Sequence, residues 1–410
     1  MKQKQMFVLF LTIFLDMLGV GILIPVLPGL FVDPLSPHYV LTPTTSTETA
    51  YLYLGLLAAI FSVGQFFASP IIGQFSDKIG RKKLLAFSIF GTGLGHALFA
   101  VGIMIKSVPL LFLSRLLDGV TGGNIVVAQA AIADISTPEN RAKNFGLIGA
   151  AFGLGFILGP FIGGKLADPT VVSWFNPTIP FWFAAMLSFA NVAMLSMFLR
   201  ETNHHVDRHA HVDWGKSIKN IFHAWSIRDL RALFLTNFLM HAGFTFYTTF
   251  AAVFFFDRFG FTESSLGNYF AYVGLWIVIT QAFITRIVSA KISGGKILRY
   301  TLPIMGVYMI GIVLLYDASL LFMLAPIFSI AMGLTQANLQ ALLSRRARPE
   351  EQGKIFGLNG SVMALAMAIP PVFSGLFASL FSPVAPIVIA GMIIMCSALV
   401  FRLMYVHKQD

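Results

Sequence analysis

The sequence predicts an all-α polytopic membrane protein with twelve transmembrane helices, and three observations support this fold class. The chain of 410 residues is 57% hydrophobic and only 11% charged, so its apolar side chains exceed what one soluble core of this length could bury. A bilayer core takes about 20 apolar residues per helix, and stretches of that length recur along the chain. Abundant glycine and proline also fit spanning helices that pack closely and bend.

The spans form two groups of six that are similar in length and separated by a polar segment. We therefore expect an N-terminal six-helix bundle at residues 1–199, a cytoplasmic linker with an interfacial helix at 200–230, and a C-terminal six-helix bundle at 231–410. Pro25 and Pro28 stand where a signal peptide would have small residues, so we expect the first span to be retained. The spans are predicted at residues 6–31, 51–75, 84–105, 109–134, 143–167, 180–199, 231–256, 264–288, 297–316, 319–343, 354–380 and 384–405.

The basic residues lie mostly in the loops on one side of the predicted membrane. If the N-terminus is inside, only Lys106, Lys165 and Arg258 fall outside, and Arg115 lies within the membrane. This asymmetry predicts an inner (cytoplasmic) membrane protein with both termini in the cytoplasm. The net charge of +10 is scattered rather than gathered into a patch, so we expect no nucleic-acid partner. The single cysteine, Cys396, leaves no disulfide or thiolate metal cluster within the chain.

A short loop between the second and third spans carries Gly73, Asp77, Gly80 and Arg81. Gly73 allows two helices to approach, Gly80 turns the chain, and Asp77 can pair with an arginine or a helix N-terminus. This spacing predicts a gating loop. The alternative is a basic turn that only obeys the rule for cytoplasmic loops.

The span at 143–167 carries small residues at three- and four-residue spacing, with a proline among them. Such spacing predicts a close-packed seam along one helix face that can bend. Ordinary helix packing is the alternative reading. The motif comprises Gly149, Gly153, Gly159, Pro160 and Gly163.

Three charged residues lie deep within predicted spans, away from the span ends. Arg115 and Asp118 are three residues apart on one helix face, and Asp16 is the only acid of the first span. Charges at this depth are costly and usually face a cavity or a partner. Their position predicts a functional role, although a purely structural pair, or a helix cap in the case of Asp16, would also explain them.

Several neutral polar residues are candidates for a substrate cavity between the helices. Most single amides in such positions form hydrogen bonds between helices, whereas histidine can also titrate. A second histidine group, His204, His205, His209 and His211, has the composition of a metal site, but a solvated loop explains it better. The cavity candidates are His96, Asn124, Asn237, His241, Gln281, Gln336 and Asn338.

The gating loop, the glycine seam and the charged start of the fourth span together resemble the major facilitator superfamily, specifically its twelve-helix drug–proton antiporters such as the tetracycline–proton antiporters. Residues 141–146, 199–202 and 340–345 extend the similarity over nearly the whole chain. The second-half counterpart of the gating loop, at 286–296, lacks the aspartate. The acids that tetracycline antiporters carry in the third and ninth helices are also missing, with Gly95 or His96 in the third and apolar residues near Met305 in the ninth.

The resemblance implies two pseudo-symmetric six-helix bundles in the major facilitator fold. It implies that Asp77 holds the outward-open state, that the glycine seam closes the pore against proton leak, and that Arg115 acts in proton transfer. A role of Asp16 in coupling or in binding a substrate cation also follows only from the resemblance, and we expect Asp118, beside Arg115, to share in the proton coupling. We therefore expect a drug exporter related to the tetracycline antiporters rather than a tetracycline pump.

These observations predict a monomeric transporter that exports small amphipathic molecules in exchange for protons, with a proton gradient as its energy source and no cofactor. A proton symporter or a carrier of sugar, siderophore or lipid on the same fold is the main alternative. A receptor that does not transport would have no need of the gating loop and the buried charges. An intramembrane enzyme is disfavoured because the spans carry no paired carboxylates, no nucleophile with its base and no metal-ligand spacing.

Overall fold

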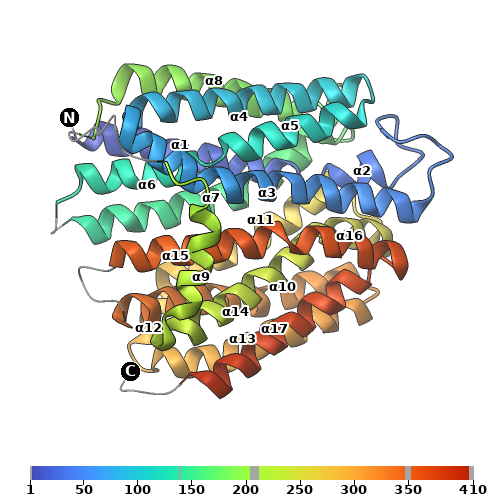
Figure 1. The fold of residues 1–410 in the computed structure, drawn as a ribbon. Helices are drawn as coiled ribbons and strands as arrows, with labels where there is room; N and C mark the ends of the chain where they lie inside the picture. The colour runs from blue at the N-terminus through green and yellow to red at the C-terminus, as the bar shows by residue number, and fades with distance from the viewer. Residues whose placement is uncertain (1, 138–139, 204–211, 347–351, 406–410) are drawn as a thin grey trace. The chain divides into compact units, whose positions relative to one another are not determined.

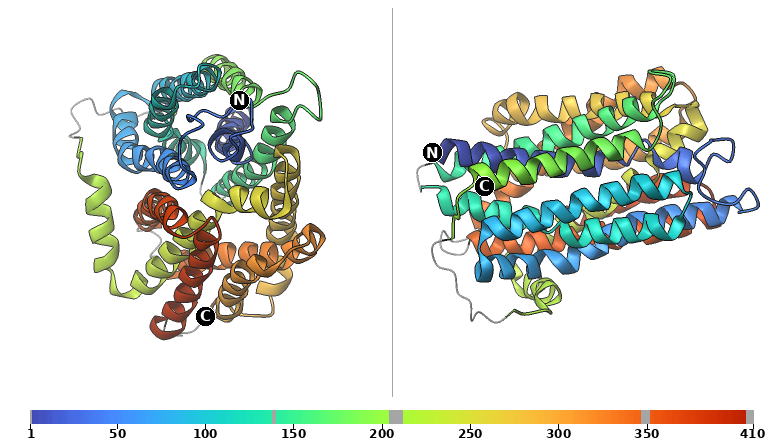
Figure 2. Two further views of the ribbon diagram at one scale, coloured as in Figure 1. Left: turned by 90° about the vertical axis from the view of Figure 1, so that its right-hand side faces the viewer. Right: turned by 90° about the horizontal axis from the view of Figure 1, so that it is seen from above.

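The computed structural model describes residues 2–137, 140–203, 212–346 and 352–405. These residues form helices and connecting turns, and no strand occurs among them. Twelve of the helical segments are long and apolar enough to span a membrane, which confirms the predicted fold class. The spanning helices of each half run alongside one another (Figures 1 and 2).

The helical elements begin and end as follows. The first half contains α1 (Lys2–Ile22), α2 (Leu27–Phe31), α3 (Thr47–Ile79), α4 (Arg81–Met104), α5 (Val108–Thr121), α6 (Asn124–Ile135), α7 (Arg141–Ala167) and α8 (Ile179–Phe198). The second half contains α9 (Lys216–Ser226), α10 (Arg228–Phe259), α11 (Glu263–Ile279), a π-helical turn (Thr280–Ile284), α12 (Thr285–Ser289), α13 (Gly294–Gly311), a 3-10 turn (Ile312–Leu314), α14 (Ala318–Arg346), α15 (Gln352–Ala368), α16 (Pro370–Leu380) and α17 (Ala385–Met404).

Three predicted spans are interrupted rather than continuous. The helix expected at 6–31 ends at Ile22, and a turn around Pro25 separates it from α2. Proline has no N–H for the helical ladder and clashes with the preceding turn, which explains the break. The span expected at 109–134 is divided by Gly122 and Gly123 into α5 and α6, and the span at 354–380 is divided before Pro370 into α15 and α16. The sequence gives the right number of crossings but misses these interruptions.

Contacts among the helices divide the chain into two compact units. Unit 1 contains Met1–Thr45, Ile60–Lys216 and Thr262–Ala271, and unit 2 contains Ser46–Ala59, Ser217–Phe261 and Tyr272–Asp410. Each unit therefore consists of most of one half of the sequence and a short helical segment from the other half. The start of α3 belongs to unit 2, and the start of α11 belongs to unit 1.

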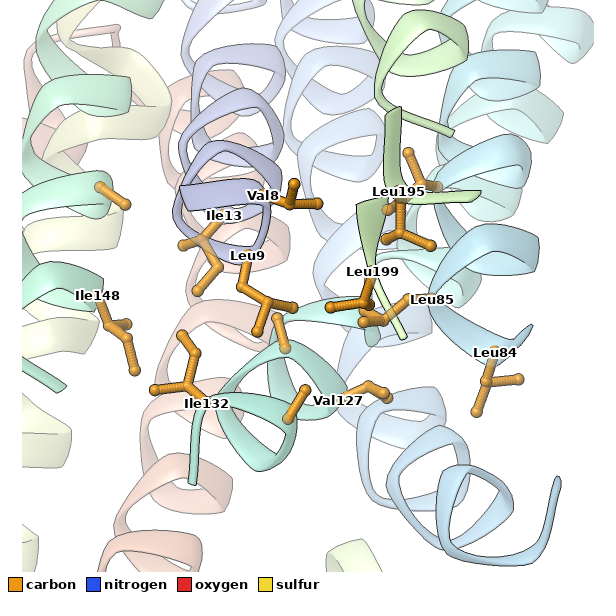
Figure 3. Close-up of a cluster of buried hydrophobic side chains, with 14 residues drawn as sticks. Val8, Leu9, Ile13, Leu84, Leu85, Val127, Ile132, Ile148, Leu195 and Leu199 are labelled. Atoms are coloured by element: carbon orange, nitrogen blue, oxygen red, sulfur yellow. The ribbon is translucent and has the colours of Figure 1, made fainter. Parts of the chain in front are cut away.

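The core of unit 1 is aliphatic near the end at which α1 begins. Side chains from α1, α4, α6, α7 and α8 meet there (Figure 3), and most of them are fully buried. Their close packing provides the van der Waals contact that holds spanning helices together. The labelled members of this cluster are Val8, Leu9, Ile13, Leu84, Leu85, Val127, Ile132, Ile148, Leu195 and Leu199.

Unit 2 combines an aromatic core with a close backbone contact. The rings of Tyr308 on α13 and Phe328 on α14 stack with centroids 4.9 Å apart, and Tyr247 on α10 lies 5.9 Å from the same phenylalanine. Gly391 on α17 lies against α13, where an added Cβ would be 2.8 Å from the carbonyl oxygen of Gly306. Small residues at this crossing let the two helices approach each other closely.

Helix α9 lies within the segment predicted as a linker, and it crosses the direction of the spanning helices of its own unit (Figure 1). Its Asn220 side chain donates to the hydroxyl of Ser361 on α15 at 2.9 Å. Ile218 and Phe222 are exposed, and an interfacial position of this helix stays a prediction.

Candidate functional site

Two opposite charges form an ion pair inside unit 1. Arg115 and Asp118 lie one turn apart on α5, with 2.6 Å between Nη1 of the arginine and Oδ2 of the aspartate. Their side chains are only 5% and 6% exposed, and the guanidinium lies over the ring of Phe61, 4.2 Å from its centroid. Charges buried among spanning helices are tolerated when they are paired. The sequence reasoning correctly placed both residues on one helix face.

Glycines let the neighbouring helices close around this ion pair. A Cβ on Gly119 would overlap the carbonyl oxygen of Phe61 on α3, and a Cβ on Gly95 of α4 would lie 3.0 Å from the Cβ of Asp118. Helices α3 and α4 therefore pack directly against the turn of α5 that carries the charges.

A second carboxylate comes from α1. Asp16 is half-buried, and Nδ2 of Asn124 donates to its Oδ1 at 2.8 Å. Asn124 is the first residue of α6, directly after the Gly122–Gly123 interruption, and Gln65 donates to the carbonyl of Gly122 at 3.0 Å. Asp16 and Asp118 are close enough to interact electrostatically. The break between α5 and α6 thus brings the amide of Asn124 to the acid of α1.

His96 completes this group of side chains. It lies on α4, is 3% exposed, and packs against the backbone of α1 at Gly19, where an added Cβ would be 2.8 Å from the imidazole Cε1. The charges of Arg115 and Asp118 act on the ring. We call Asp16, His96, Arg115 and Asp118 the buried charge cluster.

The predicted gating loop is held by a network of charged hydrogen bonds. Arg81, at the start of α4, pairs with Asp77 at 2.6 Å and with Asp134, at the end of α6, at 3.3 Å. Its guanidinium also contacts the hydroxyl of Ser76. Asp77 itself is 54% exposed. Arg81 is therefore the residue through which the ends of α3, α4 and α6 are joined.

Glu201 caps the first turn of α4. Its carboxylate accepts the backbone N–H of Arg81 at 2.8 Å and that of Lys82 at 3.2 Å. Gly80, with φ of +100°, has a backbone conformation that L side chains rarely adopt, and an added Cβ would collide with Glu201. The acid following α8 thus satisfies N–H groups that a helix N-terminus leaves free.

Helix α7 packs against α1 through three glycines spaced four residues apart. A Cβ on Gly159 would lie 2.7 Å from the carbonyl oxygen of Leu18, and Gly155 and Gly163 approach the α1 backbone equally closely. Gly149, by contrast, has nothing within 4 Å of an added Cβ, and Gly153 is partly exposed. Of the predicted motif, the α1 contact thus includes Gly159 and Gly163, and Gly155 joins them.

The end of α7 also holds the start of α11, which belongs to the same unit. Asp168 is 1% exposed and accepts the backbone N–H of Ser264 at 3.3 Å and that of Thr170 at 2.9 Å. Lys165 donates to the Ser264 hydroxyl at 2.7 Å. The glycines of α7 thus pack against two helices, α1 and α11, because Gly164 is in equally close contact with the backbone of Glu263 on α11.

The polar candidates of the second half form separate pairs within unit 2. Asn237 donates to Asn359 at 2.6 Å, and Nδ1 of His241 lies 3.0 Å from the Asn237 carbonyl. Gln281 donates to Gln336 at 3.2 Å. Asn338 accepts from Ser289 and lines a cavity of about 250 Å³ beside the start of α13. These residues do not form one cluster.

The histidines of 204–211 lie outside the described residues, so the structure gives no geometry for them. Within the described part of the chain, no three metal-ligating side chains gather.

Sequence reasoning missed four acids and amides that the structure places in these networks. Glu201, Asp134 and Asp168 each stand at or just after the C-terminal end of a helix, where the helix dipole does not favour an acid, so their local sequence does not mark them as capping residues. Their partners lie 53 to 120 residues away in the chain. Asn359, the partner of Asn237, has no local signal at all.

A chain with twelve spanning helices in two units, and with ionisable groups buried among them, has the features of a secondary membrane transporter. The family model described as Major Facilitator Superfamily matches residues 9–371, and the chain belongs to that family.

Relatives and solved structures agree with this assignment. The chain is 28% identical to the tetracycline resistance protein, class C, of Escherichia coli over 376 residues, covering 91% of this chain and 89% of the relative. It is 27% identical to multidrug resistance protein 2 of Bacillus subtilis (strain 168), covering 92% and 89%. The crystal structure of a D-xylose-proton symporter shares the fold, with a TM-score of 0.73, 16% identity, and coverage of 98% of this chain and 97% of that chain.

The α1–α7 seam predicts opposite effects at two glycines of one helix. Gly159→Ala places a Cβ 2.7 Å from a backbone oxygen of α1 and should lower stability by about 1–3 kcal/mol through overpacking. Gly149→Ala meets open space and should be neutral or stabilising by about 0.5–1 kcal/mol, because alanine is the better helix former. Thermal unfolding of the two detergent-solubilised variants measures the difference, and equal shifts would contradict the seam.

Removing the Glu201 carboxylate should loosen the start of α4. Glu201→Ala leaves two N–H groups without their acceptor, a loss of about 0.5–2 kcal/mol for a capping group. Amide hydrogen exchange should become faster in the first turn of α4 while the middle of α8 keeps its protection. Glu201→Gln, which retains an acceptor oxygen, should give a smaller effect, and unchanged exchange in the alanine variant would refute the cap.

Asp168 makes the α7–α11 contact sensitive to acid. Burial by itself would raise the pKa of this carboxyl, but hydrogen bonds from Thr170, Thr262 and Ser264 outweigh burial and hold the pKa below its ordinary value of 3.8. The carboxylate therefore stabilises the fold fully above that value and loses its contribution as the pH falls through the lowered pKa.

Asp168→Ala should consequently lower the melting temperature by a constant amount between pH 8 and pH 5, with the difference shrinking below about pH 4. The loss at neutral pH should be about 1.5–3 kcal/mol, the usual range for a hydrogen bond to a charged group. Asp317→Ala is the matched control, because Asp317 is exposed and bonds only the neighbouring Ser319. A smaller or equal effect at Asp168 would argue against the contact.

Proposed function

We propose that this protein is a secondary active transporter that exports small amphipathic molecules, drugs among them, in exchange for protons. In this proposal the bundles at 1–199 and 231–410, joined by the linker at 200–230, alternate between inward-open and outward-open states. The proton gradient supplies the energy without a cofactor. The distribution of basic loops supports an inner-membrane location with both termini in the cytoplasm.

The observation that carries the proposal is the buried charge cluster of unit 1. Its members come from α1, α4 and α5, and they include two carboxylates, Asp16 and Asp118, but only one permanent cation, Arg115. With both acids ionised and His96 neutral, the cluster has a net charge of −1. Binding one proton removes this excess charge in a region where charge is costly. A protein that only received a signal or served as a scaffold would gain nothing from this arrangement.

The same charge balance explains how a proton and a substrate exclude each other. A proton on Asp16 or Asp118 neutralises the cluster, and so would a cationic substrate group in its place. Arg115 pairs with Asp118 at 2.6 Å. The Asp77 loop would then hold the outward-open state, while the α7 seam would block a leak of protons.

The names of the relatives support the export direction. The class C protein and the Bacillus protein are named for resistance to tetracycline and to multiple drugs, and export of a compound from the cell is one cause of resistance to it. The fold alone is shared with a proton symporter, so direction must be measured.

The direction of coupling can be read from one pH signal. The purified protein is placed in liposomes that contain pyranine, without a pH gradient, and tetracycline, ethidium or D-xylose is added outside. Antiport carries solute in and protons out, so the lumen becomes alkaline whatever the orientation of the protein. We expect alkalinisation with an amphipathic drug and no response to D-xylose.

The matched variant is Asp16→Asn. Its proton signal should fall to that of liposomes without protein, while the exchange of drug inside the liposome for drug outside continues. Acidification of the lumen would show that the protein is a symporter and not an antiporter. Solute uptake by the wild-type protein without any pH change would show that transport is not coupled to protons.

A further inference from the structure

His96 is buried, and its ring nitrogens are poorly satisfied. Its imidazole is 3% exposed, and neither ring nitrogen forms a hydrogen bond of normal geometry with the described residues. A polar group left in this state costs about 1–3 kcal/mol. A leucine or methionine would fill the space on α4 without that cost, so packing alone does not account for a histidine here.

The surroundings of the ring provide acceptors for two N–H groups. The backbone carbonyls of Thr92 and Gly19 lie beside it, and the Gly19 backbone is in van der Waals contact because that residue has no side chain. Neutral imidazole has one donor and one acceptor nitrogen, whereas the protonated ring has two donors. Two carbonyls therefore complement the protonated form.

The helices packed around His96 place three charged groups near its ring. Helix α1 contributes Asp16, one turn before Gly19, and α5 contributes Arg115 and Asp118, which act on the ring directly. Helix α8 has no ionisable residue, and the single acid of α6, Asp134, lies at the helix end in contact with Arg81. The sum over these neighbours is one negative charge when both nearby acids are ionised.

We propose that His96 is a second proton-binding residue of the transport cycle, which holds the coupling proton when Asp16 gives it up. A proton from water binds the free nitrogen of the His96 ring and neutralises the cluster. It later leaves the ring, either to water, which returns the cluster to a net charge of −1, or to Asp16. A second proton would give the cluster a net positive charge, so occupancy of one site disfavours the other. This inference deepens the proposed function and rests on it for its role in transport.

Proton binding itself can be tested without any substrate. Protein labelled with ¹⁵N in its histidine rings is titrated between pH 5 and pH 9 in detergent, and the signal lost in His96→Gln identifies His96. We expect His96 to titrate in this range. In Asp16→Asn, the proton concentration at which half of the His96 rings are protonated should rise by about tenfold. The reason is that the variant lacks the negative charge of the Asp16 carboxylate, which favours the protonated ring.

His241 is the internal control, because it lies in unit 2 and its Nδ1 is next to the Asn237 carbonyl. Its titration should be the same in wild type and Asp16→Asn. The proposal would be overturned if the His96 signal does not change with pH. It would also be overturned if the titration of His96 is the same in the wild type, in Asp16→Asn and in Asp118→Asn.

A second variant separates proton binding from packing. His96→Met should unfold at the same temperature as the wild type or higher, because it removes two unpartnered polar atoms. In the liposome assay its drug-driven proton signal should fall at least tenfold and lose its dependence on pH. A destabilised His96→Met with unchanged proton movement would show that the ring only fills space.

The two levels of the proposal can fail independently. If the wild-type protein moves drug without protons, the proposed function fails even where the ring titrates with Asp16. If proton exchange is normal but His96 neither titrates nor alters its pH dependence, only the role of His96 is wrong.

Discussion

A charge inside an apolar region must be paired, neutralised or hydrogen-bonded, and this requirement shapes unit 1. The 2.6 Å pair between Arg115 and Asp118 meets it for two charges, and the neighbouring helices pack tightly around the pair. Gly95 and Gly119 make that packing possible because α4 and α3 approach α5 where no side chain intervenes. The two glycines and the ion pair therefore depend on each other. A larger side chain at either glycine would push a helix away from the ion pair, and a smaller side chain in place of either charge would leave a gap.

Helix contact through small residues is the general means of assembly in this protein. Lipid is as apolar as a leucine side chain, so spanning helices gain little from hiding apolar surface and depend on close van der Waals contact. Gly159 against Gly21 in unit 1 and Gly391 against Gly306 in unit 2 provide such contacts. The halves differ in what these contacts enclose. In the described residues, unit 1 encloses paired ions, whereas unit 2 encloses neutral amides such as Asn237 and Asn359.

The sequence could predict features that depend on nearby residues and on composition. Apolar stretches predicted the twelve spans, and three-residue spacing predicted that Arg115 and Asp118 share a helix face. Partners from distant segments could not be predicted in this way. Nothing in the local sequence relates Glu201 to Arg81 or Asn124 to Asp16, because each pair forms only when separate helices pack together. The break at Gly122–Gly123 was missed for a related reason, since glycine pairs also occur within continuous spanning helices.

Capping by distant acids explains how the frame around the buried charge cluster is kept in place. A helix N-terminus has N–H groups without intrahelical partners, and Glu201 satisfies two of them on α4 while Asp168 satisfies one at the start of α11. Both acids follow the end of another helix, so each cap ties two helices together where loops alone would allow them to separate. Helix α4 carries His96. Glu201 holds the first turn of this helix, and the glycine contacts hold the rest of it. In the proposed function, a proton entering the cluster would therefore meet helices already fixed by their neighbours.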